Sequence, residues 1–393
     1  MNITNVVKQI EPEIITNRRE LHKIPELGLE LPKTVAYVKA QLDAMAIPYQ
    51  ELVNGNALVG LIKGGHPGKT LAIRADMDGL PIQEETGLEF TSQTGNMHAC
   101  GHDGHTAMLL GAARILSENK HLLHGNVKLL FQPGEEFPGG AKPMIDEGCM
   151  ENPPVDAVIG LHEGHINDIV KPGDIGVSYG KAMASMDRIL LRVIGRGVHG
   201  AYPEQGVDPI VIAAEIISSL QRIISREINA ADNGLISICR IQGGFNQNII
   251  PDVVEMEGTV RATDPTVRQK LARRIDEVAR GIAQTFNAQC EVTYDFKYPP
   301  LVNDRAFTEK FVESAKKIID PERIMTIEKP IMGGEDMAYF LEKAPGTFFF
   351  LANPREIDGK YWPHHNSRFD VDESQLWLGS ALFVQTALDY LAN

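Results

Sequence analysis

Several features that mark other protein classes are missing from this 393-residue sequence. It has no run of about 18 apolar residues, which a membrane-spanning helix needs, and its first residues include no apolar core of a secretory signal. Its 4 cysteines are scattered and form no Cys-x-x-Cys pair, which favours reduced thiols over a disulfide framework. We therefore expect a cytoplasmic protein with no membrane partner.

A surplus of basic residues is also absent. The chain has 38 lysines and arginines against 52 acidic residues, and its formal net charge is −14. No basic stripe is therefore expected to neutralise phosphates, which excludes nucleic acid as a partner. A hydrophobic content of 43% with 23% charged residues is typical of a globular protein. A chain of this length is too long to fold around one simple hydrophobic core, so we expect about two domains.

One stretch concentrates groups that bind metals. Residues 96–105, the Cys100 loop, read Asn-Met-His-Ala-Cys-Gly-His-Asp-Gly-His. Cys100 and His102 are two residues apart, so both can face one way in an extended loop, and thiolate and imidazole are good ligands for divalent ions. Apolar residues at 106–116 predict a buried helix directly after the loop. A cysteine–histidine nucleophile site is the main alternative.

Acidic or histidine side chains also follow three predicted strands. The strands are expected at 70–74, 126–131 and 155–161, and the side chains are Asp76 and Asp78, Glu135 and Glu136, and His162. Strands that alternate with helices predict a mainly parallel α/β sheet, in which ligands gather at the carboxyl ends of the strands. We therefore predict that one crevice collects these side chains with the Cys100 loop and binds metal.

The pattern changes after Met186 to the order βαββαβ, which predicts a ferredoxin-like domain. After Pro300, helices and strands alternate again, and a second pair of imidazoles follows at His364 and His365. We therefore predict an α/β catalytic domain formed by residues 1–183 and 298–393, with an inserted ferredoxin-like domain at 184–297.

The motifs resemble those of the M20 metallopeptidases. They read RADMDGLP at 74–81, HACGHDGH at 98–105, QPGEE at 132–136, GLH at 160–162, GRGVHGA at 195–201 and GGED at 333–336. The resemblance covers essentially the whole chain and is greatest for the amidohydrolase branch of hippurate hydrolases, N-acyl-amino-acid deacylases, auxin-conjugate hydrolases and N-acetyldiaminopimelate deacetylases. It implies a metal-dependent amidohydrolase that cleaves N-acyl amino acids. A dipeptidase or aminopeptidase of the same family is the alternative.

The resemblance also implies two divalent metal ions per chain. Its pattern of ligands falls on Cys100, His102, Glu136, His162 and one of the late histidines. His365 is preferred over His364, because in similar proteins the ligand directly precedes a short polar turn. A thiolate ligand leaves the metal open between zinc, manganese, nickel and cobalt. The wider family usually has His and Asp ligands, so the thiol at Cys100 argues against activity on long peptides.

Further roles follow from the same resemblance. Glu135 would be the general base, since adjacent residues of an extended segment face opposite ways and one carboxylate can bind metal while the other meets the activated water. His199 resembles an oxyanion donor from the inserted lid and dimerisation domain of a neighbouring subunit, which implies a homodimer or higher oligomer. Asn248 and Arg261 are candidates to bind a substrate carboxylate. Two more residues are expected to orient ligands: Asp103 and His105.

Two other functions compete with the binuclear amidohydrolase. One is an amidase with Cys100 as nucleophile and His102 as its base, which a chelator would leave active. The other is a metal- or peptide-binding protein without catalysis, which would have no need for Glu135. We therefore expect an amidohydrolase with a small N-acyl amino acid as substrate.

Overall fold

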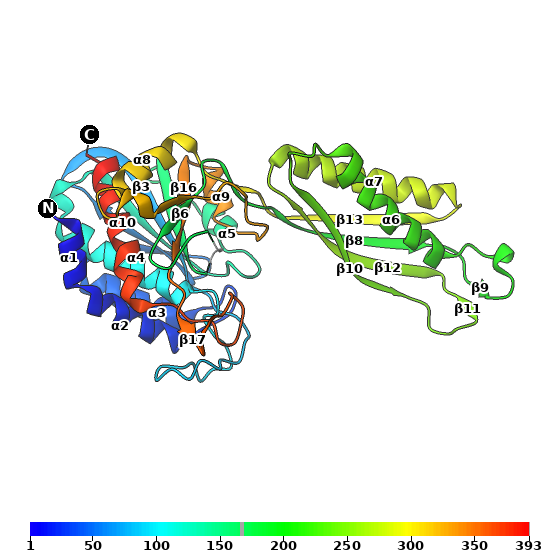
Figure 1. Ribbon diagram of the computed structural model, residues 1–393, viewed down its shortest axis with the longest axis horizontal. Coiled ribbons are helices and arrows are strands. Elements are labelled where there is room, and N and C mark those ends of the chain that lie inside the picture. Colours follow the sequence, from blue (N-terminus) through cyan, green and yellow to red (C-terminus); the bar gives the residue numbers. More distant parts are fainter. Residues whose placement is uncertain (166–168, 393) are drawn as a thin grey trace. The chain divides into compact units, whose positions relative to one another are not determined.

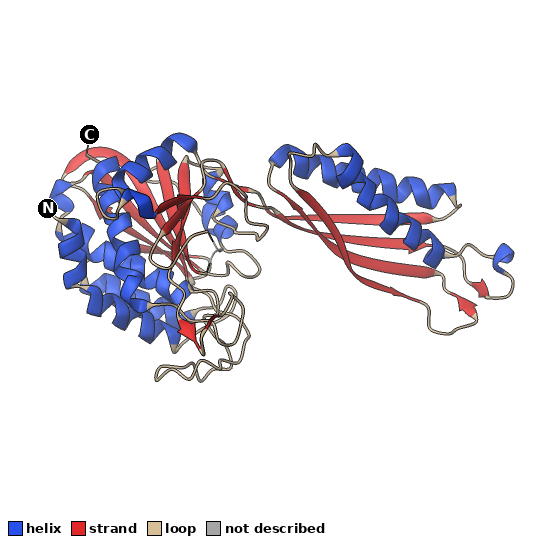
Figure 2. Ribbon diagram, in the orientation of Figure 1, coloured by secondary structure: helices blue, strands red, loops and turns tan. Residues whose placement is uncertain are grey.

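The computed structural model describes residues 1–165 and 169–392, which form two compact units (Figures 1 and 2). Unit 1 comprises Met1–Gly180, Val302–Lys329 and Asp336–Asn393, and unit 2 comprises Lys181–Leu301 and Pro330–Glu335. Each unit has its own sheet and its own apolar core.

Unit 1 is built on an eight-stranded sheet in the order β1-β2-β4-β3-β5-β16-β6-β15. The four central strands β4, β3, β5 and β16 are mutually parallel, whereas β1, β2 and β6 each pair antiparallel with a neighbour. This confirms the predicted mainly parallel α/β sheet. The strands are β1 (Tyr49–Leu52), β2 (Ala57–Lys63), β3 (His66–Asp76), β4 (His124–Gln132), β5 (Ala157–Gly164), β6 (Ile175–Val177), β15 (Ile324–Thr326) and β16 (Gly346–Ala352).

The helices of unit 1 bury an apolar core against this sheet. They are α1 (Ile3–Gln9), α2 (Glu11–His22), α3 (Pro32–Ala44), α4 (His102–Glu118), α5 (Ala141–Asp146), α8 (Arg305–Ala315), α9 (Ala338–Leu341) and α10 (Leu376–Tyr390). Pro12 lies in the first turn of α2, where its missing N–H costs nothing, so a new helix begins there and α1 ends at Gln9. Helix α4 is buried along almost its whole length because α2 and α10 pack on it.

Unit 2 has the order β8 (Met186–Ile194), α6 (Pro209–Glu227), β10 (Gly234–Gly243), β12 (Val253–Ala262), α7 (Pro265–Thr285) and β13 (Gln289–Tyr298). Its antiparallel sheet has the order β10-β12-β8-β13, which leaves β10 and β13 at the edges. Side chains such as Leu191, Ile216 and Leu271 form its core. The βαββαβ order that the sequence predicted is therefore present.

The remaining short elements connect or extend these layers. They are η1 (Lys120–Leu122), β7 (Lys181–Met183), β9 (Val198–His199), η2 (Pro203–Gln205), β11 (Ile249–Ile250), β14 (Leu301–Val302), η3 (Pro321–Arg323), β17 (Glu356–Ile357), β18 (Lys360–Tyr361) and η4 (Glu373–Gln375). Residues 330–335 group with unit 2 although they follow α8 in sequence, because the Ile331 amide donates to Ala182 O and Ile331 O accepts from the Ala184 amide, both at 2.9 Å.

Across residues 1–165 and 169–392, we find no helix whose length and apolar character would allow it to cross a membrane.

Candidate metal centre

The carboxyl ends of β3, β4 and β5 meet at one edge of the unit 1 sheet, because these strands are parallel neighbours. Potential ligand atoms there form overlapping groups, each within 4.8 Å, and three of these groups hold the predicted ligands: Cys100, His102 and His162; Cys100, Glu136 and His365; and His102, Glu135 and Glu136. Unit 1 therefore brings together all five predicted ligands and the predicted base.

Two glycines allow the Cys100 loop to enter α4 against the buried Glu163. Gly101 has a φ of 85°, in the left-handed region that favours glycine, and it precedes the first residue of α4. A Cβ atom at Gly104 would lie 1.7 Å from Glu163 Oε1. Only glycine fits there, so Cys100 and His102 approach the end of β5 closely.

The ring of His102 is buried, and neither nitrogen makes a hydrogen bond. Its Nδ1 lies 3.3 Å from Asp78 Oδ1, and its Nε2 lies 3.7 Å from Asp76 Oδ2. Burial alone lowers the pKa of His102, but the two carboxylates raise it to about 10. The two carboxylates thus favour a positive charge beside the ring nitrogens of His102. A bound metal cation would supply that charge.

Asp78 fixes the segment that carries the two glutamates. Its Oδ1 accepts from the Glu135 amide at 2.9 Å, and its Oδ2 accepts from the Glu136 amide at 3.1 Å. The same carboxylate faces His102, so it orients three candidate site residues at once. The sequence showed Asp78 at a strand end but gave no sign of this double acceptor role.

The thiol of Cys100 lies among acids. Its Sγ is 3.4 Å from His162 Nε2, while His162 Nδ1 lies 2.9 Å from Glu163 O and donates to it as Nδ1–H. Burial, with Glu136 and Glu135 nearby, raises the pKa of Cys100 well above its ordinary value. A thiolate at this place needs a cation, which disfavours Cys100 as a free nucleophile and suits it as a metal ligand.

The two late histidines point to different partners. His364 Nε2 lies 2.7 Å from Glu163 O and donates to it. His365 has a φ of 64°, and its Nε2 pairs with the buried Glu136 Oε1 at 2.9 Å. Only His365 belongs to a group with Cys100 and Glu136.

His105 uses both of its ring nitrogens within the protein. Its Nε2 accepts from the Glu163 amide at 3.0 Å, so Nδ1 carries the proton and donates to Asp76 Oδ1 at 2.6 Å. No lone pair is then left for a metal. His105 instead connects the ends of β3 and β5.

Asp103 points away from the candidate ligands. Its Oδ2 lies 2.8 Å from Arg18 Nε and 2.7 Å from His22 Nδ1. Arg18 also pairs with Asp370 at 2.8 Å. Asp103 therefore anchors the first turn of α4 to α2 and to the C-terminal segment.

The other three predicted residues belong to unit 2. His199 is exposed on β9, and its Nδ1 accepts from the Ala201 amide at 3.1 Å. Asn248 is close to it, since Asn248 O accepts from the Gly200 amide at 2.7 Å. Arg261 lies on β12, half-buried, and its buried Nη1 has no hydrogen bond.

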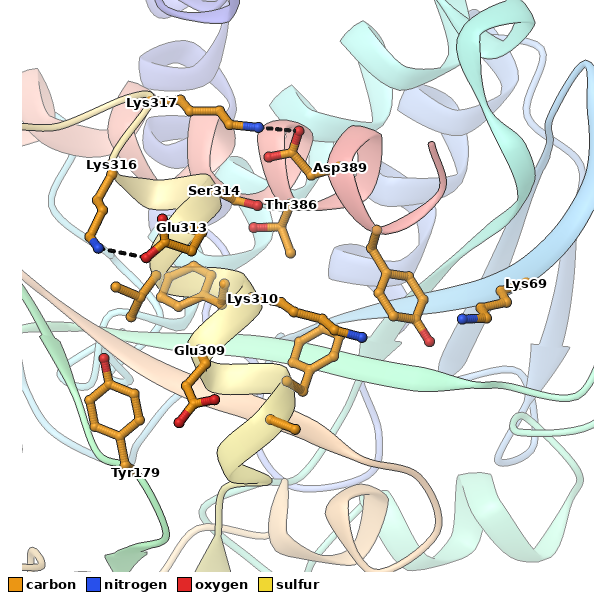
Figure 3. A pocket seen from close by; sticks show the side chains of 15 residues that line it. Lys69, Tyr179, Glu309, Lys310, Glu313, Ser314, Lys316, Lys317, Thr386 and Asp389 are labelled. Carbon is orange, nitrogen blue, oxygen red and sulfur yellow. Dashed lines mark hydrogen bonds and ion pairs between the residues drawn. The ribbon is translucent and has the colours of Figure 1, made fainter. Parts of the chain in front are cut away.

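A cavity of about 800 Å³ in unit 1 lies elsewhere, beside α8 and α10 (Figure 3). It is lined by residues such as Lys69, Lys310 and Tyr390, and two of its lysines form the ion pairs Lys316–Glu313 and Lys317–Asp389. None of the candidate ligands lines it. The size of a cavity therefore does not identify the candidate metal centre, whereas the cluster of potential ligand atoms does.

Residues 72–389 match the family model of Peptidase family M20/M25/M40. The chain belongs to this family. Thermostable carboxypeptidase 1 of Saccharolobus solfataricus is 40% identical to this M20 chain, covering 99% of it and 98% of the relative. The N-acetyl-L-cysteine deacetylase of Bacillus subtilis is 39% identical, over 96% of this chain and 88% of the relative.

A solved structure agrees with this family. The YXEP protein of Bacillus subtilis, described as a dinuclear metal-binding peptidase of the M20 family, superposes with a TM-score of 0.83 at 34% identity and covers 98% of this chain and 99% of its own. The resemblance inferred from the sequence motifs is confirmed. The chain is an M20 hydrolase that acts on amide bonds.

Proposed function

We propose that this M20 hydrolase cleaves N-acyl amino acids to a carboxylic acid and a free amino acid. The observation that carries the proposal is the convergence of Cys100, His102, Glu136, His162 and His365 around Glu135 at one edge of the unit 1 sheet. The similarity to an N-acetyl-L-cysteine deacetylase supports an N-acyl amino acid as substrate.

We propose that two divalent ions bind per chain, one between Cys100, His102 and His162 and one between Cys100, Glu136 and His365. The ring nitrogens of His102, which make no hydrogen bond, and the close approach of His365 Nε2 to Glu136 Oε1 support this assignment. Zinc or manganese suits these donors, and nickel or cobalt is the alternative. When bound, the ions act as Lewis acids that polarise the amide carbonyl and make water more acidic. Cys100 must stay reduced to be a ligand, and all four cysteines are free, which supports a cytoplasmic location.

Glu135 acts as the general base. Its backbone is held by Asp78, and the residue is buried beside Glu136 and His102. Glu135 takes a proton from the attacking water, whose oxygen bonds to the acyl carbon. It then gives that proton to the leaving nitrogen as the C–N bond breaks, so the products are an acid and an amine. No covalent bond to the protein forms.

We propose that unit 2 completes the site in a homodimer. His199 would donate a hydrogen bond to the oxyanion in the partner subunit, and Asn248 and Arg261 would bind the substrate carboxylate. The exposure of His199 and the unpaired Arg261 Nη1 support these roles. The edge strand β10 offers unpaired backbone groups for a two-fold contact.

Mixed dimers test the role of His199. A Glu135→Gln chain and a His199→Ala chain, each inactive alone, are mixed until their subunits exchange. One site of each mixed dimer then has both groups, so activity should recover to about a quarter of wild type. Exchange without recovery would exclude action across the dimer.

A carboxypeptidase is the second candidate, because a relative of that name is 40% identical over almost the whole chain. Both reactions release an amino acid with a free carboxylate, so the group on the other side of the amide separates them. The test is a panel of acetyl, benzoyl, succinyl and indoleacetyl amino acids beside dipeptides and longer peptides, each assayed with zinc, manganese, nickel and cobalt. Faster cleavage of peptides than of every N-acyl amino acid would replace the proposal with the carboxypeptidase.

A further inference from the structure

His364 lies beside the candidate metal centre but, among the described residues, belongs to none of the groups of candidate ligand atoms. Its half-buried ring stands edge-on to the ring of His162, at a centroid distance of 4.8 Å and an angle of 84° between the planes. The ring of the buried Phe369 also lies 4.8 Å from it. A side chain packed in this way against a ligand controls the orientation of the ligand without giving an atom to the metal.

One backbone oxygen accepts from both imidazoles. Glu163 O lies 2.9 Å from His162 Nδ1 and 2.7 Å from His364 Nε2. A carbonyl oxygen has two lone pairs, so both hydrogen bonds form at once. Because Nδ1 of His162 carries the proton of its bond, the lone pair of that ring is on Nε2, which lies 3.4 Å from Cys100 Sγ. The bond from His364 thus fixes the acceptor that orients His162.

The backbone around this oxygen leaves room for His364. Gly164 has a φ of 106°, and a Cβ atom there would lie 2.5 Å from His364 Nε2, so only glycine allows the ring to approach the end of β5. The Gly164 amide donates to Asn353 Oδ1 at 2.8 Å, and Asn353 Nδ2 donates to Glu163 Oε2 at 2.7 Å. The acceptor of the two imidazoles is therefore part of a firmly held segment.

His364 also connects the segments that carry the other candidate ligands. It directly precedes His365, which belongs to the group with Cys100 and Glu136. The His365 amide donates to Ala99 O at 2.8 Å, next to Cys100. The two adjacent histidines therefore contact both the end of β5 and the Cys100 loop.

We propose that His364 is a positioning residue for His162. By sharing Glu163 O and packing against the ring, it keeps His162 Nε2 directed toward Cys100 and thereby raises the affinity for the ion between Cys100, His102 and His162. This inference rests on the proposed function, through its assignment of that ion. His364 acts through His162 and is not itself a ligand.

The test measures the affinity of the metal-free protein for Zn²⁺ and for Co²⁺ by competition with a chelator. His364→Leu removes the hydrogen bond and should weaken one of the two ions about tenfold. The visible absorption spectrum of bound Co²⁺, which depends on the arrangement of its ligands, should change as well. His364→Gln restores a donor for Glu163 O and should bring the affinity to within about threefold of wild type. A purely structural role would lower the stability of the metal-free protein and leave affinities and spectrum unchanged.

Two further backgrounds identify the residue through which His364 acts. In Glu136→Ala, where the ion between Cys100, His102 and His162 remains, adding His364→Leu should still cost about tenfold in affinity. In His162→Ala, adding His364→Leu should change the affinity for the remaining ion by less than about twofold, because the ring that it positions is gone. Equal losses in both backgrounds would show that His364 acts through His365 and would overturn the inference.

The matched control is His124→Leu. His124 is also a half-buried histidine of unit 1 that packs on another imidazole, that of His66 at 4.4 Å, but it lies at the first residue of β4, and its loss should change neither affinity. If His364→Leu fails to fold, His364→Asn, whose shorter side chain does not reach Glu163 O, should show the same loss. Unchanged affinities in a folded variant would overturn this inference while the proposed function stands. If His162→Ala binds as many ions as wild type, the ion assignment of the proposed function fails too.

Discussion

The two units bury different kinds of side chain. In unit 1, Arg74, Asp76 and Asp336 are almost fully buried and pair with one another at 2.7 and 2.9 Å. In unit 2 the core is apolar, and most ion pairs, such as Arg192–Glu291, are at least partly exposed. Burying a charged group costs free energy of folding unless the charge is paired. The buried charges of unit 1 therefore mark the part of the fold that is built for catalysis at the expense of stability.

The acids of unit 1 outnumber the cations that could neutralise them. Asp76, Asp78, Glu135 and Glu136 gather at the strand ends, where Arg74 pairs with Asp76 and Asp336. Divalent ions would balance this charge. Residues 181–301 and 330–335, all of them described, include no group of three candidate ligands of their own. We therefore expect metal binding to stabilise unit 1 and to leave the stability of unit 2 unchanged.

The largest expected effect is loss of turnover in Glu135→Gln. The substitution keeps size and removes the base, so kcat should fall by about 10² to 10⁴ while substrate affinity and metal content change little. Steady-state kinetics and elemental analysis of the same preparation measure both. Near-normal turnover would place the base elsewhere.

In unit 2 the largest effect should come from the deeply buried carboxylate of Asp187. Asp187 accepts from Arg268 at 2.6 and 2.9 Å and from the hydroxyl of Tyr294 at 2.8 Å. Asp187→Ala leaves Arg268 without its counter-charge and should cost about 3 kcal/mol in denaturant unfolding. The exposed control Glu291→Ala should cost less than about 1 kcal/mol. Metal content should match wild type in both, and loss of metal in Asp187→Ala would contradict the division between units.

A chelator should loosen unit 1 selectively. At a metal concentration about 100 times the Kd, binding contributes about 2.7 kcal/mol, which the chelator removes. Hydrogen exchange should speed up in the first turn of α4 and in residues 132–136, and should stay unchanged in β12. Equal acceleration in both units would show that the metal stabilises the whole chain.

The smallest effect concerns His22, buried between Asp103 at 2.7 Å and Glu84 at 3.2 Å. Burial lowers its pKa, but these acids raise it overall above the ordinary value of about 6.5. A raised pKa means that the stabilisation is fully present below about pH 6.5 and is lost as pH rises through the folded-state value. His22→Gln should therefore cost about 1 to 2 kcal/mol near pH 6 and less near pH 9.

Thermal melting at both pH values measures this difference. The matched control is His121→Gln, an exposed histidine of the same unit, which should show no such pH dependence. A cost for His22→Gln that grows with pH would reverse the sign and contradict a charged His22.

Features that depend on local residue patterns and on the order of parallel strands could be predicted from the sequence. Strand and helix periodicity, with the rule that parallel strands end at one edge, predicted that Asp76, Glu135 and His162 lie together. Partners far apart in sequence had no such signal. Arg18 and Asp370 are 352 residues apart, and no spacing rule joins them. The choice of His365 over His364 depended on the family resemblance. The left-handed backbone at His365, which turns the two side chains toward different partners, cannot be predicted from two adjacent histidines in a sequence.

The most direct test of the metal-dependent mechanism is elemental analysis combined with an N-acyl amino acid assay on the same samples of wild type and Cys100→Ala. We expect about two divalent ions per chain and hydrolysis in wild type, and no more than one ion with activity lost in the variant. Wild type that is active without bound metal, or a Cys100→Ala chain that keeps both ions and full activity, would contradict it.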